Sequence, residues 1–221
     1  MQKLLGGIEV FRRESQAGYQ KKFASLAYRQ QPDALLIACC DSRVVPNVFA
    51  SADPGDLFVV RNIGNCVPSY SASTFHDVSV GAVLEWAIEG LSISDIIVCG
   101  HSDCGAMHAL LGGLSHAPPL MQQWLAHALP VKDSLGQQGK PSVDDQAKAN
   151  VLFQIEHLQT YPLVQKQLAR QALRLHGWFF DIPTGDVFEF DPDKGEFTVL
   201  NAAQIARVRR RMELHAQGSP P

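Results

Sequence analysis

The stretch ALLIAC, residues 34–39, decides the fold of this chain. It is a continuous apolar run that follows the helix-breaking pair Pro32-Asp33, and it shows no alternation of apolar and polar side chains. Strands with this pattern are buried on both faces, as in parallel sheets covered by helices. We therefore predict that residues 34–39 form a strand of such a sheet.

The rest of the chain alternates similar apolar runs with helical patterns. Predicted strands cover 57–62, 94–100 and 175–182, and a hairpin joins 186–190 to 197–200. Predicted helices cover 2–29, 76–90, 119–129 and 143–159, and two more begin near Cys104 and at Pro162. This order indicates an α/β fold, with a mostly parallel β-sheet flanked by helices.

Composition limits the class of protein. We expect residues 1–221 to form a single domain with a helical arm at 1–30 and a tail at 200–221. The formal net charge of −3 predicts no nucleic-acid partner, and no apolar run is long enough for a membrane span. Five cysteines without a secretory signal favour a reducing, cytoplasmic location.

The tail carries one basic run, RVRRR, at residues 207–211. We interpret it as the solvated face of a last helix, in preference to an anion or partner site.

Two motifs follow predicted buried strands, ACCDSR at 38–43 and CGHSDCGA at 99–106. Both motifs therefore lie at the carboxyl ends of their strands, which is where ligands bind in open α/β sheets. Two thiolates and an imidazole suit Zn²⁺, so Cys39, His101 and Cys104 are candidate ligands. Because side chains alternate along a strand, Cys40 points to the face opposite to Cys39. We therefore predict that Cys40 is a packed thiol and not a ligand.

With these motifs in view, the sequence resembles a β-class carbonic anhydrase over roughly residues 2–190. The stretches that carry the resemblance are CCDSRVVPN, PGDLFVVRNIGN, GAVLEWAI, IIVCGHSDCGA and LHGWFFDI. The chain is most similar to the bacterial and cyanobacterial branch, including enzymes encoded beside cyanases. The resemblance implies reversible hydration of CO₂ to bicarbonate, with Cys39, His101 and Cys104 as zinc ligands.

The resemblance also implies a catalytic dyad of Asp41 and Arg43. Asp41 has two possible positions: it can be the fourth zinc ligand of a closed site, or it can pair with Arg43 and orient a zinc-bound hydroxide. Arginine suits the second arrangement because its planar fork grips a carboxylate with two parallel bonds.

By resemblance, a substrate pocket for CO₂ and bicarbonate is lined by Gln30, Phe58, Ile63, Trp86 and Gly105. Gln30 is expected to act across a dimer interface. Phe58 and Ile63 could equally be core residues, and core packing is at least as plausible for Trp86, which stands where many members have tyrosine. A further histidine, His76, could carry protons, although a lone histidine is more often structural.

One branch of the family is inhibited by bicarbonate bound at a tryptophan, an arginine and a tyrosine. The matching positions here are Leu36, Arg61 and Phe180, so only the arginine is retained. We therefore predict an enzyme that lacks this pocket and has an open metal site.

Two alternatives remain open from sequence. The same fold and metal could hydrolyse carbonyl sulfide or carbon disulfide, or the site could be a non-catalytic zinc or redox-sensing module. The start of the amphipathic arm lacks an obvious partner in its own chain. The resemblance implies that the arm lies across a second subunit, so we expect a homodimer and beyond it a tetramer.

Overall fold

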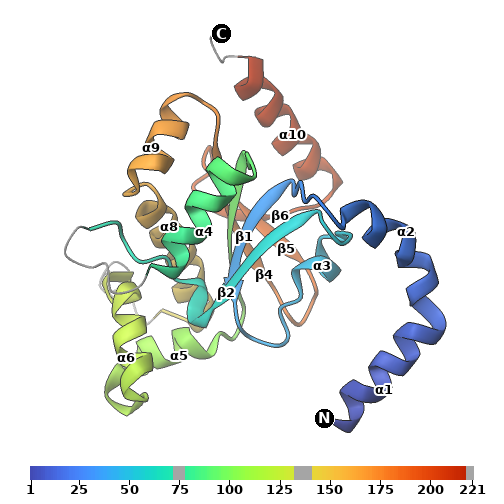
Figure 1. Cartoon of the computed structure of the whole chain (residues 1–221). Helices are drawn as coiled ribbons and strands as arrows, with labels where there is room; N and C mark the ends of the chain where they lie inside the picture. Colours follow the sequence, from blue (N-terminus) through green and yellow to red (C-terminus); the bar gives the residue numbers. More distant parts are fainter. Residues whose placement is uncertain (72–77, 132–140, 218–221) are drawn as a thin grey trace.

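The computed structural model describes residues 1–71, 78–131 and 141–217. Its centre is a six-stranded mixed sheet in the order β2-β1-β3-β4-β5-β6 (Figure 1). The strands are β1 (Ala34–Cys39), β2 (Leu57–Asn62), β3 (Asp95–His101), β4 (Arg174–Phe180), β5 (Val187–Asp191) and β6 (Glu196–Val199). The first four in this order run parallel, and β5 and β6 form the antiparallel hairpin at one edge. The predicted α/β sheet is confirmed.

The central strands explain the continuous apolar runs. All six residues of β1 are buried, because β2 and β3 flank it and helices or loops cover both faces. The edge strand β2 is only partly buried, so its sequence tolerates polar residues such as Arg61. Burial on two faces thus distinguishes the central strand from the edge strand.

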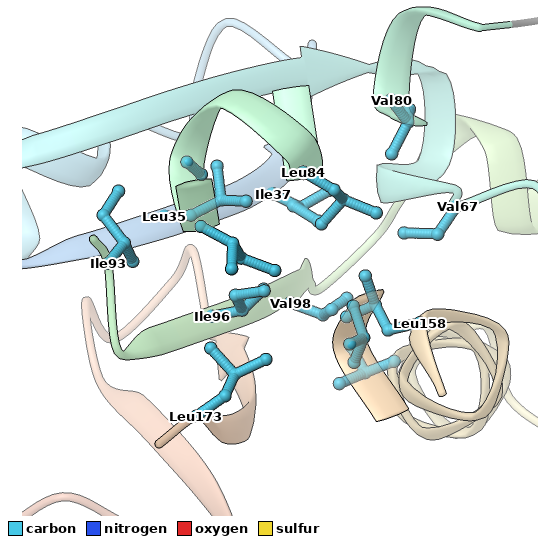
Figure 2. Packing of buried hydrophobic residues seen from close by; sticks show 14 residues of the cluster. Leu35, Ile37, Val67, Val80, Leu84, Ile93, Ile96, Val98, Leu158 and Leu173 are labelled. Atoms are coloured by element: carbon cyan, nitrogen blue, oxygen red, sulfur yellow. The ribbon is translucent and has the colours of Figure 1, made fainter. Parts of the chain in front are cut away.

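One face of the sheet carries the largest apolar cluster. Leu35 and Ile37 of β1 and Ile96 and Val98 of β3 point into it (Figure 2). They pack against the helices α4 (Ser79–Glu85), α8 (Val143–Leu158) and α9 (Pro162–Ala169), together with the π-helical turn at Trp86–Gly90. The opposite face packs Leu36, Ala38, Ile97 and Cys99 against α3 (Pro46–Phe49) and its neighbours.

The remaining helices lie at the ends of the sheet. They are α5 (Gly105–Gly112), α6 (Pro119–Leu125) and α10 (Ala202–Gln217). Helix α8 begins at a capping box. The Ser142 side chain accepts from the Asp145 amide, and the Asp145 side chain accepts from the Ser142 amide. His76, the histidine that could carry protons, lies outside the described residues.

The N-terminal arm consists of α1 (Gln2–Val10), a π-helical turn (Phe11–Ser15) and α2 (Gln16–Leu26). It leads away from the sheet, and none of its residues is buried (Figure 1). Only its end is tied to the body, where Lys22 Nζ contacts Asp53 Oδ2 at 2.9 Å. The predicted helix is confirmed, with its end at Leu26.

The basic run of the tail is not simply solvated. Arg207 Nη2 lies 3.0 Å from Asp193 Oδ2, and Arg211 Nη2 lies 3.5 Å from Glu189 Oε1. Helix α10 therefore turns two of its arginines toward acids of the hairpin. Arg207 is still exposed, as predicted, whereas Arg211 is only partly exposed, so the predicted solvated face does not hold for Arg211. Arg210 is exposed, as expected.

Candidate metal centre

Three potential ligands meet where β1 and β3 end. Cys39 is the last residue of β1, His101 is the last of β3, and Cys104 is the N-cap of α5. One ligand atom from each lies within 4.8 Å of the other two, and all three residues are buried. They converge because β1 and β3 are parallel neighbours, so their carboxyl ends share one edge of the sheet.

A tight turn brings Cys104 back to the strand ends. Asp103 has a φ of +52°, in the left-handed region, which reverses the chain between His101 and α5. Ser102 ties this turn to the end of β4, because its amide donates to Phe180 O at 3.0 Å and its hydroxyl accepts from Ile182 N at 2.9 Å.

The histidine is arranged to offer a lone pair. Its Nδ1 lies 2.9 Å from the Ser102 carbonyl oxygen, which can only accept, so Nδ1 carries the proton. Its Nε2 is buried and has no hydrogen-bond partner among the described residues. A buried nitrogen lone pair beside two sulfurs fits a metal ion that prefers S and N ligands.

The two sulfurs influence each other's pKa in opposite directions. A hydrogen bond from Cys104 is the main cause that lowers the pKa of Cys39 to about 4, and it outweighs the effect of burial. The same interaction raises the pKa of Cys104. The Gly64 amide also donates to Cys39 Sγ at 3.4 Å. Of the two, Cys39 is the more acidic thiol.

Gly64 needs its lack of a side chain. Its φ is +74°, and a Cβ there would lie 3.0 Å from the Cβ of Ala106. Its carbonyl accepts from Asn150 Nδ2 of α8 at 2.9 Å, which holds the amide toward Cys39.

Asp41 is paired with Arg43 and is not among the atoms that converge with the ligands in the described structure. Arg43 Nε donates to Asp41 Oδ1 at 3.0 Å and Nη2 donates to Oδ2 at 2.8 Å. The Arg43 amide also donates to Oδ1 at 2.9 Å. The Arg43 side chain is the main cause that holds the pKa of Asp41 well below its usual range.

A second acid shares the same guanidinium. Arg43 Nη1 donates to Asp103 Oδ2 at 3.1 Å, and Asp103 Oδ1 lies 2.7 Å from Nε2 of the exposed His108. The position of Asp103 between His101 and Cys104 indicates from sequence that it lies near the ligands. Its contact with Arg43 depends on the turn at Asp103 and could not be read from the sequence.

The predicted pocket residues do not all gather around this centre. Gly105 and Ile63 are adjacent in sequence to Cys104 and to Gly64, and both are exposed. Phe58 packs against the main core, and its Cα is roughly 13 Å along β2 from the end of that strand. Gln30 is exposed between the arm and β1.

Trp86 is 56% exposed, so the alternative that it belongs to the core is wrong. Its ring covers Gly90 on the turn after α4, on the outer side of the helix, while its neighbour Val83 packs inward.

The remaining cysteines have different surroundings. Cys66 and Cys99 are buried, and burial raises the pKa of each to about 12. Cys40 is exposed, so the predicted packed thiol is wrong. The strand ends at Cys39, so the alternation between two buried faces does not extend to Cys40, which lines a hollow with Ile63 and Trp124.

The positions that match the bicarbonate pocket are packed with apolar groups. Leu36 is fully buried, and Phe180 stacks on Phe49 with ring centroids 4.7 Å apart. Arg61 instead donates to the backbone carbonyls of Cys39 and Asp41.

Sequence reasoning missed a buried charge cluster far from this centre. His176 Nε2 lies 2.9 Å from Asp95 Oδ1, and His176 Nδ1 lies 3.1 Å from Glu189 Oε1. Arg174 binds the same Asp95 through Nε and Nη2 at 2.7 and 2.5 Å. Charged residues at alternate positions of an otherwise apolar strand, 174 and 176, were the available signal.

The chain is similar to known proteins over most of its length. The family model for carbonic anhydrases matches residues 34–187. A carbonic anhydrase of Synechocystis is 39% identical over 198 residues, covering 86% of this chain and 71% of the relative. One from Pseudomonas aeruginosa is 38% identical, covering 90% of this chain and 92% of the relative.

Solved structures give the same result. The β-carbonic anhydrase CcaA superposes with a TM-score of 0.83 at 37% identity, covering 91% of this chain and 92% of its own. A tetrameric β-carbonic anhydrase of Sordaria macrospora gives 0.75 at 29% identity, covering 89% and 98%. Within the described ranges, no helix is both long and apolar enough to cross a bilayer.

Proposed function

Because the chain belongs to the carbonic anhydrase family, we propose that it hydrates CO₂ reversibly at a zinc ion held by Cys39, His101 and Cys104. The observation that carries the proposal is the convergence of these three buried ligand atoms within 4.8 Å. Two sulfurs and one nitrogen form a ligand set suited to zinc, and three protein ligands are typical of catalytic zinc sites.

Bound zinc would supply an acidified water molecule as the nucleophile, and charge neutralisation by two thiolates would place the working pH above that of a three-histidine site. The chain's own contribution begins with the imidazole. Its Nδ1 bond to the Ser102 carbonyl fixes the ring so that Nε2 faces the sulfurs.

Asp41 is the residue that we propose to orient the nucleophile. Its Oδ2 accepts one bond from Arg43 and keeps further acceptor capacity. The fork of Arg43 holds the carboxylate away from the ligand atoms, so the arginine prevents the acid from becoming a fourth ligand. This arrangement supports an open site, and a closed site would require the fork to release Asp41.

The substrate pocket would be completed by a second copy of the chain. Among the described residues, Gln30, Ile63, Trp86 and Gly105 are exposed while Phe58 packs against the main core, and the arm carries exposed apolar side chains. Those of its first helix and turn are Leu4, Leu5, Ile8, Val10 and Phe11. We propose that the arm lies across a partner in a homodimer and that dimers pair into a tetramer, which tetrameric neighbours support.

We further propose that residues 1–221 act as one catalytic domain in the cytoplasm. All five cysteines are free thiols, which supports a reducing compartment.

The test measures metal content and CO₂ hydration on the same preparations. Stopped-flow hydration by zinc-loaded protein should fall by roughly 100-fold or more in Asp41→Asn, with its zinc content unchanged, because only the orienting group is lost. Carbonyl sulfide is assayed in parallel. Protein that contains no zinc, or that turns over carbonyl sulfide but not CO₂, would refute the proposal.

A further inference from the structure

Arg61 of the edge strand β2 contacts the backbone of the neighbouring ligand strand. Its Nε donates to the carbonyl oxygen of Cys39 at 3.0 Å, and its Nη2 donates to that of Asp41 at 2.7 Å. One planar guanidinium therefore bridges the carbonyls of a metal-ligand candidate and of the proposed catalytic acid.

The segment that it bridges has little other support. The β1–β2 ladder ends at Cys39 paired with Asn62, and the Cys40 amide makes one last bond to the Asn62 carbonyl at 2.9 Å. Beyond that bond the chain turns, with the Val44 amide donating to Asp41 O at 3.0 Å. The carbonyls of Cys39 and Asp41 lie on either side of the exposed Cys40, at the point where the β1–β2 ladder ends.

Resting on the proposed function, we infer that Arg61 is a positioning residue that fixes the Cys39–Asp41 segment. It holds the backbone on both sides of Cys40 and so sets where the Cys39 sulfur and the Asp41 carboxylate lie relative to each other. Residues that orient metal ligands through hydrogen bonds typically change metal affinity or activity by about 10–100-fold when they are removed.

The alternative role for Arg61 is anion binding, since the family has an arginine at this position of its bicarbonate pocket. Here the two companion positions are the packed, apolar Leu36 and Phe180, which offer no hydrogen-bond donor. The guanidinium is also already engaged with two carbonyls. The contacts thus favour backbone positioning over anion binding.

The experiment compares Arg61→Met, Arg61→Lys and the control Arg210→Met. Methionine keeps an apolar stem but removes every donor, and lysine keeps the charge and a single nitrogen. Arg210 is exposed on α10, at the other end of the chain from the ligands. Zinc dissociation constants come from competition with a chelator, and the visible absorption spectrum is recorded on cobalt-loaded protein.

We expect Arg61→Met to bind zinc about 10–100-fold more weakly and to change the thiolate-to-cobalt and d–d bands. Arg61→Lys should be intermediate, and Arg210→Met should match the parent. If Arg61→Met does not fold, Arg61→Lys decides, with weaker binding and an altered spectrum expected.

Parent-like affinity together with a parent-like cobalt spectrum in the decisive variant would overturn the inference. Bicarbonate inhibition that disappears in that variant without loss of metal affinity would assign Arg61 to an anion site and also overturn it. The zinc affinity and the cobalt spectrum need no turnover, so these two readouts remain decisive if the parent binds metal but fails to hydrate CO₂, which would refute only the proposed function.

Discussion

Replacing His176 by glutamine should destabilise the protein in a pH-dependent way. Both ring nitrogens face carboxylates that can only accept, Asp95 at 2.9 Å and Glu189 at 3.1 Å. A neutral ring could donate to only one of them, so the arrangement is that of an imidazolium. Burial by itself lowers the pKa of His176, but the hydrogen bonds to the two acids outweigh it and raise the pKa above its ordinary value.

The size of the effect follows from what remains after the substitution. Removing one partner of a buried ion pair costs about 3–5 kcal/mol. Arg174 still neutralises Asp95, but Glu189 is 2% exposed and keeps only Arg211 at 3.5 Å. We therefore expect the lower end, about 3 kcal/mol, which corresponds to a fall in Tm of about 6–12 °C for a chain of this length.

The sign of the pH dependence is set by the raised pKa. Stability from a group with a raised folded pKa is fully present below its unfolded pKa, about 6.5 for histidine, and is lost as the pH rises through the folded value. The difference in Tm between parent and His176→Gln should therefore be largest at pH 6 and shrink toward pH 9.

The assay is thermal unfolding of metal-loaded protein, followed by circular dichroism at pH 6 and pH 9. The control is His116→Gln, at an exposed position outside the cluster. An equal Tm difference at both pH values, or none at pH 6, would refute a charged bridge.

Three further predictions follow. Cys39→Ser should lower zinc affinity and hydration by at least about 100-fold, whereas Cys40→Ser, at an exposed thiol, should keep both; equal losses would contradict the ligand assignment. Because the neighbouring Cys39 raises the pKa of Cys104, and a thiol must lose its proton to bind a metal, zinc binding should release a proton and tighten as the pH rises, which calorimetry in buffers of different ionisation enthalpy measures. Leu84→Ala should cost about 2–5 kcal/mol in urea unfolding because Leu84 is 1% exposed, and Leu120→Ala, at a 78% exposed site, should change it by less than about 0.5 kcal/mol.

The parts of the fold that sequence predicts well are those set by local pattern. The run ALLIAC marks a strand buried on two faces, and the convergence of Cys39 with His101 follows once two such strands are parallel neighbours. Strand alternation failed for Cys40 because the rule assumes a covering layer, and the sheet has ended there.

Contacts between distant residues lie outside the reach of such patterns. Arg211 meets Glu189 across 22 positions, and a helical pattern cannot name a partner on another element. The same holds for Arg61, whose acceptors are backbone carbonyls that leave no trace in residue type. The pocket roles proposed for Phe58 and Trp86 rest on the proposed second copy of the chain, which a pattern within one sequence does not describe.

The unpacked arm has a consequence for local stability. Its two α-helical segments have nine and eleven residues and bury nothing. Helices in proteins gain most of their stability from tertiary packing, which the arm lacks within one chain. Amide hydrogens of the first 26 residues should therefore exchange with solvent far faster than those of β1 in a solitary chain, and in the proposed dimer their protection would measure how completely the subunits have associated at a given dilution.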